Sequence, residues 1–283
     1  MCDTCGCNVT PGNRHLLDAP TPGTAIDVLQ GLLSANDRAA EHNRQHLNRH
    51  RVLAINLMSS PGAGKTSLLE ATIEHLQSEF RIAVIEGDLE TENDARRIRA
   101  KGVPAIQIST GTACHLDAHM VHNALHQLPL ADLDLLFIEN VGNLVCPASF
   151  DLGHHRNVTL LSVTEGDDKP AKYPVMFRGT DVLLITKTDL LPVFDDFNPQ
   201  QVRQHLQHLA NDAAVMQLAV RRYQYINPWL QWLRRQFAQF QDSLSLGTDI
   251  PRPRAQRDSA KLHNDATQPR YRPVTAPPSP LMR

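Results

Sequence analysis

Six short apolar runs recur along the middle of the chain, and segments with helical patterning separate most of them. The helical patterns are clearest at 65–79, 91–100 and 115–126. Strands and helices that alternate at this spacing form a mostly parallel sheet flanked by helices. We therefore expect one α/β domain over residues 24–244, with a helix at 25–48 as its first element. The apolar runs are residues 52–58, 82–86, 104–108, 135–139, 158–163 and 182–186.

The two ends of the chain are rich in proline. Ten of the 19 prolines lie within residues 1–22 and 245–283. Proline-rich polar stretches bury too little apolar surface to offset the entropy lost on ordering. We expect residues 1–23 to form a flexible arm and residues 245–283 to form a disordered, mildly basic tail.

The charge of the chain is balanced. Its 283 residues carry 28 Lys and Arg against 30 Asp and Glu, a formal net charge of −2. This balance argues against a general nucleic-acid binder. No apolar stretch approaches the ~18 residues that cross a bilayer, and the first residues lack the pattern of a secretory signal. We expect a cytoplasmic protein without nucleic-acid or membrane partners.

Residues 59–66 (SSPGAGKT) lie between the first predicted strand and the first long predicted helix. This is the position of a P-loop, in which backbone N–H groups and a helix N-terminus hold phosphates. The strict pattern begins with glycine, where this chain has Ser59. Lysine in the motif reaches the β- and γ-phosphates, and the hydroxyl that follows it binds Mg²⁺. The predicted phosphate-binding residues are Gly62, Ala63, Gly64, Lys65, Thr66 and Ser67.

Two acidic residues stand at the ends of predicted strands, where open parallel sheets bind ligands. Asp88 follows the run IAVIE, and Glu139 ends the run LLFIE. We expect both to assist Lys65 and Thr66 in nucleotide and metal chemistry. Glu139 begins the segment ENVG, which is similar to the Asp-x-x-Gly switch of GTPases with Glu in place of Asp.

Residues 186–189 (TKTD) follow the run VLLIT and are similar to the Asn-Lys-x-Asp guanine motif. The Asp189 carboxylate can accept hydrogen bonds from guanine N1–H and the exocyclic amine, which adenine cannot offer. Lys187 is the second expected base-site residue. Thr186 stands in place of the usual Asn, and residues 217–220 (QLAV) match a base-supporting serine–alanine loop poorly.

Three of the five cysteines lie in the first seven residues, MCDTCGC. Thiolates this close together indicate a metal site or a redox group in a reducing compartment. Cys2, Cys5 and Cys7, with the terminal amine nearby, suit Ni²⁺, Zn²⁺ or Cu(I), and a square-planar S₃N set favours nickel.

A second group of soft ligands comes from separate segments. Cys114 and His115 follow one predicted strand, and Cys146 lies four residues after Gly142. Together they offer three ligands, one fewer than a structural zinc site needs. Water or a second subunit could supply the fourth, and a buried structural thiol is an equal alternative for either cysteine. We assign no role to the other histidines, including His154, His155 and those of 41–50, and expect them at the surface.

Several of these segments together resemble the HypB family of hydrogenase nickel-incorporation GTPases, of the SIMIBI class of P-loop proteins. The resemblance implies a SIMIBI-class G domain. It also implies a nickel site at Cys2, Cys5 and Cys7, and a zinc or nickel site at Cys114, His115 and Cys146. The segments are MCDTCGC, NLMSSPGAGKTSLLE, EGDLETENDARRI, GTACHLDAHM, FIENVGNLVCPASFDLG and SVTEGDDKPAKYP.

The resemblance further implies GTP hydrolysis with Mg²⁺, a nucleotide-linked homodimer and nickel delivery to the [NiFe]-hydrogenase large-subunit precursor with a HypA-type chaperone. A polyhistidine storage stretch, found in some members, is absent from this sequence. Three alternatives remain: a urease-type nickel chaperone of the UreG kind, an ATP-using P-loop kinase, and a metal-binding module with a relic P-loop.

Overall fold

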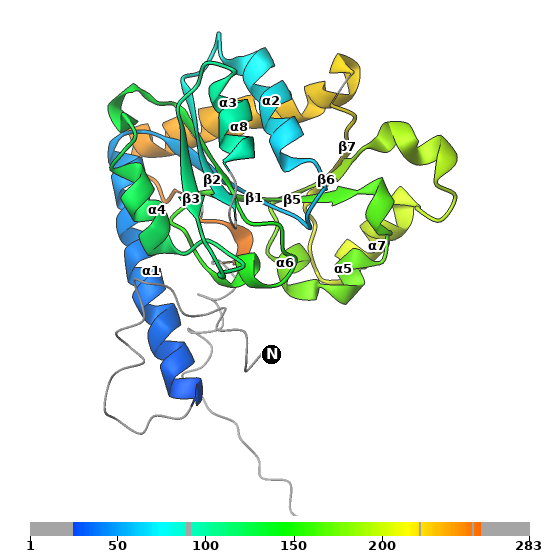
Figure 1. The fold of residues 1–283 in the computed structure, drawn as a ribbon, viewed down its shortest axis with the longest axis horizontal. Helices are drawn as coiled ribbons and strands as arrows, with labels where there is room; N and C mark the ends of the chain where they lie inside the picture. Colours follow the sequence, from blue (N-terminus) through cyan, green and yellow to red (C-terminus); the bar gives the residue numbers. More distant parts are fainter. Residues whose placement is uncertain (1–24, 89–91, 221, 251, 256–283) are drawn as a thin grey trace, which may run out of the picture.

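Seven parallel strands form one sheet at the centre of the molecule (Figure 1). The structure, a computed structural model, describes residues 25–88, 92–220, 222–250 and 252–255. The spatial order of the strands is β3-β2-β4-β1-β5-β6-β7. The strands are β1 (Leu53–Met58), β2 (Ile82–Asp88), β3 (Ala105–Ser109), β4 (Leu135–Glu139), β5 (Arg156–Ser162), β6 (Val182–Thr186) and β7 (Ala214–Gln217).

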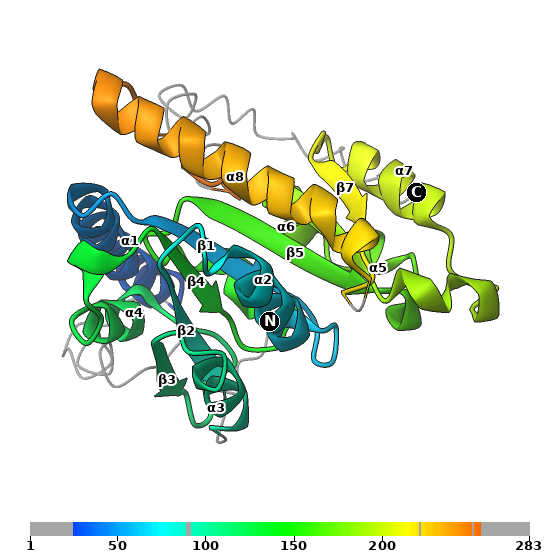
Figure 2. The same cartoon turned by 90° about the horizontal axis from the view of Figure 1, so that it is seen from above.

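Helices cover both faces of this sheet, as Figures 1 and 2 show. Helices α2, α3 and α8 lie on one side, and α1, α4, α6 and α7 lie on the other. The predicted α/β class is therefore confirmed. In the described part of the chain, no helix has the length and apolarity needed to span a membrane. The helices are α1 (Ala25–Arg49), α2 (Lys65–Leu76), α3 (Asn93–Arg99), α4 (Ala118–Leu125), α5 (Lys169–Lys172), α6 (Pro174–Arg178), α7 (Pro199–His208) and α8 (Tyr223–Leu246), with 3-10 turns at Leu130–Asp132, Cys146–Ser149, Val163–Glu165 and Thr188–Val193.

The long helix α8 returns over the sheet to pack against α2. Trp229 of α8 is fully buried, and its indole N–H donates to the Thr72 hydroxyl at 2.9 Å. Trp229 also stacks on Trp232, with 5.3 Å between ring centroids. Leu68 and Leu233 belong to the same buried cluster. Aromatic side chains of this size dominate the energetics of a core, so α8 completes the core above the first βα unit.

Helices α1 and α4 form the opposite layer over β1, β2 and β4. Leu47 of α1 and Val121 and Leu125 of α4 are buried against Ile85 and Ile138 of the sheet. This packing places the two helices side by side along much of their length (Figures 1 and 2).

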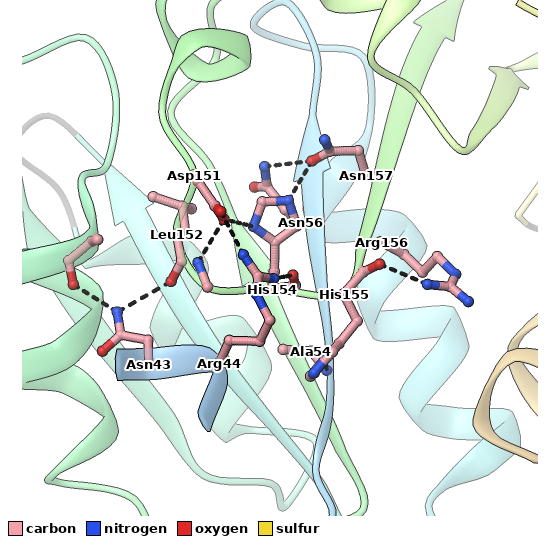
Figure 3. A network of polar contacts seen from close by, with 12 residues as sticks. Asn43, Arg44, Ala54, Asn56, Asp151, Leu152, His154, His155, Arg156 and Asn157 are labelled. Atoms are coloured by element: carbon pink, nitrogen blue, oxygen red, sulfur yellow. Dashed lines mark hydrogen bonds and ion pairs between the residues drawn. The ribbon is translucent and has the colours of Figure 1, made fainter. Parts of the chain in front are cut away.

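A buried polar network fastens α1 to the start of β5 (Figure 3). His155 Nδ1 accepts the Ala54 N–H at 2.9 Å, and its Nε2 lies 2.9 Å from the Asn48 amide oxygen. His154 Nε2 lies 2.6 Å from the Asn157 amide oxygen. Both histidines are less than 2% exposed, so the surface position expected for them is wrong. Specific hydrogen bonds offset the cost of burying these rings.

These two imidazoles should make folding sensitive to acid. Burial lowers the pKa of His154 to about 4 and lowers that of His155 well below its usual value. Between pH 6.5 and 4 the unfolded chain binds protons that the folded chain does not, so stability is lost as the pH falls. Each histidine contributes up to ~1.4 kcal/mol per pH unit. Urea unfolding at pH 7.5 and pH 5 measures this loss.

The slope of stability against pH shows whether His154 causes the loss of stability. In His154→Asn, stability should fall less steeply with decreasing pH than in the parent, whatever the variant's stability at pH 7.5. The exposed His208 of α7 provides the control, because His208→Asn should leave the slope unchanged. An equal slope in the parent and in His154→Asn would contradict this role.

Candidate functional site

The loop between β1 and α2 has the backbone of a phosphate-binding loop. Gly62 and Gly64 have positive φ angles of 77° and 97°, a region that side chains rarely adopt. Gly64 caps α2 without a side-chain hydrogen bond. The N–H groups of the first turn are therefore available to an anion, and the helix dipole favours negative charge there.

The two polar side chains that open α2 meet Glu139 at the end of β4. The Thr66 hydroxyl donates to Glu139 Oε1 at 3.0 Å, and Lys65 Nζ lies 3.9 Å from the same oxygen. Lys65 Nζ also donates to the Ser59 hydroxyl at 3.2 Å. Ser59, which departs from the strict motif, thus contacts the phosphate-binding lysine. All three predicted residues come together as expected.

A cavity of about 540 Å³ opens in front of this group, and Asp88 is among its lining residues. Two further carboxylates, Glu86 and Asp94, line the same cavity and were not predicted from the sequence. Ligand oxygens of Glu86, Asp94 and Glu139 lie within 4.8 Å of one another, because β2 and β4 pair with Glu86 opposite Glu139. Glu86 could have been proposed from the sequence, because it is a charged residue that ends the apolar run IAVIE, as Glu139 ends LLFIE.

The two buried carboxyls cannot both ionise without a counter-charge. Burial, and then the Glu139 charge, raises the pKa of Glu86 far above its usual value. Burial also raises the pKa of Glu139, and the nearby positive charge of Lys65 partly opposes this rise. Oε2 of each carboxyl is buried without a hydrogen-bond partner among the described residues. Hard oxygen donors beside a hydroxyl fit Mg²⁺.

A second cavity, of about 320 Å³, adjoins the first and shares Gly64 and Lys187 with it. It is lined by Asp189, which lies in the turn after β6, and by Ser67 of α2. The Lys187 ammonium donates to the Gly62 carbonyl at 2.8 Å. Two joined cavities, one beside the P-loop and one beside Asp189, match the phosphates and the base of a nucleotide.

Two departures from the guanine pattern have structural explanations. The Thr186 hydroxyl donates to the Ala63 carbonyl at 2.7 Å, which ties the end of β6 to the P-loop. Residues 217–220 continue from β7, and the Leu218 carbonyl accepts the Thr188 N–H at 3.1 Å. Val220 lines the cavity beside Asp189. The segment therefore contributes to the cavity beside Asp189, although its sequence matches a base-supporting loop poorly.

The second predicted metal set also comes together. One ligand atom from each of Cys114, His115 and Cys146 lies within 4.8 Å of the others. His115 is fully buried and stacks on Phe150 with 4.0 Å between ring centroids. Burial lowers its pKa to about 4, and its Nε2 has no hydrogen-bond partner in the described part of the chain. A neutral imidazole beside two thiols fits Ni²⁺ or Zn²⁺.

The segment after β4 joins the nucleotide and metal groups. The Asn140 amide oxygen accepts the backbone N–H of Leu116, which follows His115, at 3.2 Å. A Cβ on Gly142 would lie 2.9 Å from backbone atoms of Pro61 in the P-loop. The strand end that positions Glu139 therefore also holds the Cys114–His115 loop and leads to Cys146.

The first predicted metal set, Cys2, Cys5 and Cys7, lies outside the described residues. The flexible arm and the disordered tail at 245–283 stay predictions, although the described structure continues to residue 255 apart from residue 251.

Comparisons with known proteins agree with this arrangement. Residues 53–217 match the family model described as CobW/HypB/UreG, nucleotide-binding domain. The hydrogenase maturation factor HypB of Azotobacter chroococcum mcd 1 is 50% identical over 211 residues, or 75% of this chain and 69% of that protein. The HypB of Escherichia coli K12 is 47% identical over 211 residues, which cover 75% of this chain and 72% of that protein.

A solved structure of HypB from Helicobacter pylori in complex with nickel superimposes with a TM-score of 0.70 at 41% identity. The match covers 72% of this chain and 96% of that one. Such identity across most of both chains, with the phosphate loop and the cysteine–histidine set in place, shows the family. The chain belongs to the HypB family of hydrogenase maturation factors, within the CobW/HypB/UreG group of nucleotide-binding domains.

Proposed function

We propose that this protein is a GTP-hydrolysing nickel metallochaperone that serves the maturation of [NiFe]-hydrogenase. The observation that carries the proposal is the segment after β4, because it links Glu139, which contacts Thr66 of the P-loop, to Cys146 of the soft-ligand set. A nucleotide site and a nickel site that share one segment suit delivery of a metal under nucleotide control.

Hydrolysis would use the charges around the P-loop. Lys65 neutralises the negative charge that develops between the β- and γ-phosphates, and the N–H groups of α2 hold the phosphate oxygens. Thr66, Glu139 and Asp88 would hold Mg²⁺, which supplies further charge stabilisation when bound. Glu86 and Asp94 extend this acidic wall. A γ-phosphate held by these residues would lie in the cavity that Gly142 also lines, and Gly142 lies against Pro61.

Guanine selectivity rests on Asp189 in the smaller cavity. We expect Asp189→Asn to weaken GTP binding roughly 10- to 150-fold, because the amide keeps one acceptor oxygen but loses the negative charge and replaces the second acceptor with an NH₂ donor. ATP binding should change little. Fluorescent GTP and ATP analogues measure both affinities, and Asp195→Asn, at an exposed position, serves as the control. Equal weakening for both nucleotides would contradict the guanine assignment.

Nickel is the cargo in this proposal, and the HypB of Helicobacter pylori crystallised with nickel supports it. Cys114, His115 and Cys146 offer three ligands, so the fourth position is left for water, a partner or the recipient. Zinc would suit the same set. Cys2, Cys5 and Cys7 would form a separate nickel site on the arm.

The family implies a setting for this chemistry. We propose a homodimer that forms with nucleotide bound, a HypA-type chaperone as partner, and the large-subunit precursor of [NiFe]-hydrogenase as recipient in the cytoplasm.

One assay separates this function from two of its alternatives, the kinase and the metal-binding module. The purified full-length protein is incubated with GTP or ATP and Mg²⁺, with and without Ni²⁺, and both released phosphate and nucleoside diphosphate are measured. Hydrolysis of GTP alone supports the proposal. Formation of ADP without released phosphate, once an acceptor is added, indicates a kinase, and turnover of neither nucleotide indicates a metal-binding module.

A further inference from the structure

Histidines gather on the outer face of α1 and α4, apart from the nucleotide and cysteine sites. We call this group the α1–α4 histidine cluster. Each ring lies within 6.5 Å, centroid to centroid, of another ring of the cluster. The members are His42 and His46 on α1, His50 directly after α1, His122 on α4 and His126 at the C-cap of α4.

Two of these imidazoles already have the geometry of a chelating pair. His122 of α4 and His126 at the C-cap of α4 are four residues apart, and their Nε2 atoms are 3.1 Å apart. Two imidazole nitrogens on one transition metal, each at about 2.0–2.1 Å, are separated by roughly 3 Å. Histidines at i and i+4 on one helix face form such pairs in zinc enzymes.

The hydrogen bonds around Asn43 fix the tautomer of His122. The Asn43 amide nitrogen donates to the carbonyls of Ala118 at 2.8 Å and Leu152 at 3.1 Å (Figure 3 shows the Leu152 side). Its amide oxygen, 3.0 Å from His122 Nδ1, must therefore accept a hydrogen bond from a protonated Nδ1. The lone pair of His122 is left on Nε2, which faces His126. Metal-bound histidines are oriented in this way by a partner on the other ring nitrogen.

Helix α1 brings two further imidazoles to the pair. The His42 ring centroid is 5.1 Å from that of His122, and the His46 centroid is 5.7 Å from that of His126. His46 Nδ1 is buried and has no hydrogen-bond partner among the described residues. A surface hollow of about 280 Å³ beside His46, His50 and His126 gives access from solvent. Rotation of the exposed His42 ring and the half-buried His46 ring would complete a four-nitrogen set.

Two rings of the cluster, those of His46 and His122, favour the neutral, metal-binding form. Burial, and then the neighbouring histidines, lowers the pKa of His46 and of His122. The Arg49 charge adds to this effect on His46. Neutral imidazole is the form that binds metal, so protons compete only weakly with a metal ion for the ring nitrogens of His46 and His122.

We propose that His122 of α4 and His126 at its C-cap, completed by His42 and His46 of α1, form a further binding site for one divalent transition metal ion. Four imidazoles suit Ni²⁺, Zn²⁺ or Cu²⁺. The ion would cross-link α1 to α4, the helix that begins directly after Cys114 and His115. The site contains neither thiolate nor nucleotide contacts and does not depend on the proposed function.

The test isolates imidazole binding in the full-length chain. Cys2, Cys5, Cys7, Cys114 and Cys146 are all replaced by serine, and Ni²⁺ or Zn²⁺ is titrated calorimetrically at pH 7.5 without nucleotide. We expect one ion per chain. His122→Gln and His126→Gln should each weaken binding at least ~10-fold. The matched control replaces His205 and His208 of α7 by Gln and should bind like the thiol-free parent.

Two results would overturn the proposal: no saturable binding by the folded thiol-free chain, or unchanged affinity in both α4 variants. If circular dichroism shows that the thiol-free chain is unfolded, the comparison uses the native cysteines. Metal content is then measured after saturation and gel filtration. The native chain should hold one ion more than its His122→Gln/His126→Gln double variant, and equal contents would reject the site.

Discussion

The Lys65→Ala variant should lose nucleotide hydrolysis, with the rate falling at least ~100-fold. Lys65 is the cation that opens α2, and its ammonium lies 3.2 Å from the Ser59 hydroxyl and 3.9 Å from Glu139. Phosphoryl transfer depends mostly on charge stabilisation, and backbone N–H groups alone replace little of it. Phosphate release under saturating GTP and Mg²⁺ measures the effect.

Two further variants make the result interpretable. Lys65→Met keeps most of the buried volume and should be as inactive as Lys65→Ala, which separates lost charge from lost packing. Lys101 forms an ion pair with Glu74 outside the P-loop, so Lys101→Ala should keep the parent rate. Parent-like hydrolysis in folded Lys65→Ala would show that the reaction takes place elsewhere.

A second large effect is expected on metal affinity. In a chain whose Cys2, Cys5 and Cys7 are serine, the Ni²⁺ affinity of the remaining sites should differ between the GDP state and a state with a non-hydrolysable GTP analogue. A coupling of ~1–3 kcal/mol corresponds to roughly 5- to 150-fold. The physical reason is the segment after β4, where Gly142 lies against Pro61 and Asn140 holds the backbone beside His115.

The reciprocal measurement comes from linkage. Ni²⁺ should change the affinity for the GTP analogue, relative to GDP, by the same factor. Cys146→Ala removes the ligand carried by the segment after β4 and should abolish the difference between the two nucleotide states. Identical Ni²⁺ affinities in both states of the arm-substituted parent would refute the coupling, whatever the Cys146→Ala variant does.

The sheet was predictable from the sequence because its central strands are continuous apolar runs. β7 was not predicted because it is not a continuous apolar run. Ala214 and Gln217 are exposed at the sheet edge, and the strand has only four residues. Short edge strands carry little apolar pattern. The helix boundaries were less exact, as α2 ends at Leu76 rather than residue 79.

The nucleotide site was predictable where a motif names the residue, as at Lys65 and Asp189. Glu86 was missed because a charge inside a strand has no meaning until β2 and β4 pair and bring it to Glu139. His154 and His155 were wrongly expected at the surface because the residues that satisfy them inside the protein, Asn157 and Asn48, are also polar and give no apolar pattern in the sequence. Polarity in a sequence does not reveal whether water or protein satisfies a group.

The return of α8 over α2 has a consequence for how the protein is made. Trp229 and Leu233 fill the core above Leu68, yet α8 is the last helix in the chain order of the described structure. A ribosome that has released only the P-loop, the strands and Asp189 exposes a nascent chain whose phosphate-binding helix still lacks its cover. N-terminal segments emerge first at ~5–20 residues per second, so the βα unit that carries Lys65 waits for roughly 7 to 30 seconds before α8, which begins at Tyr223, can dock. During that interval the apolar face of α2 is a surface that molecular chaperones can recognise.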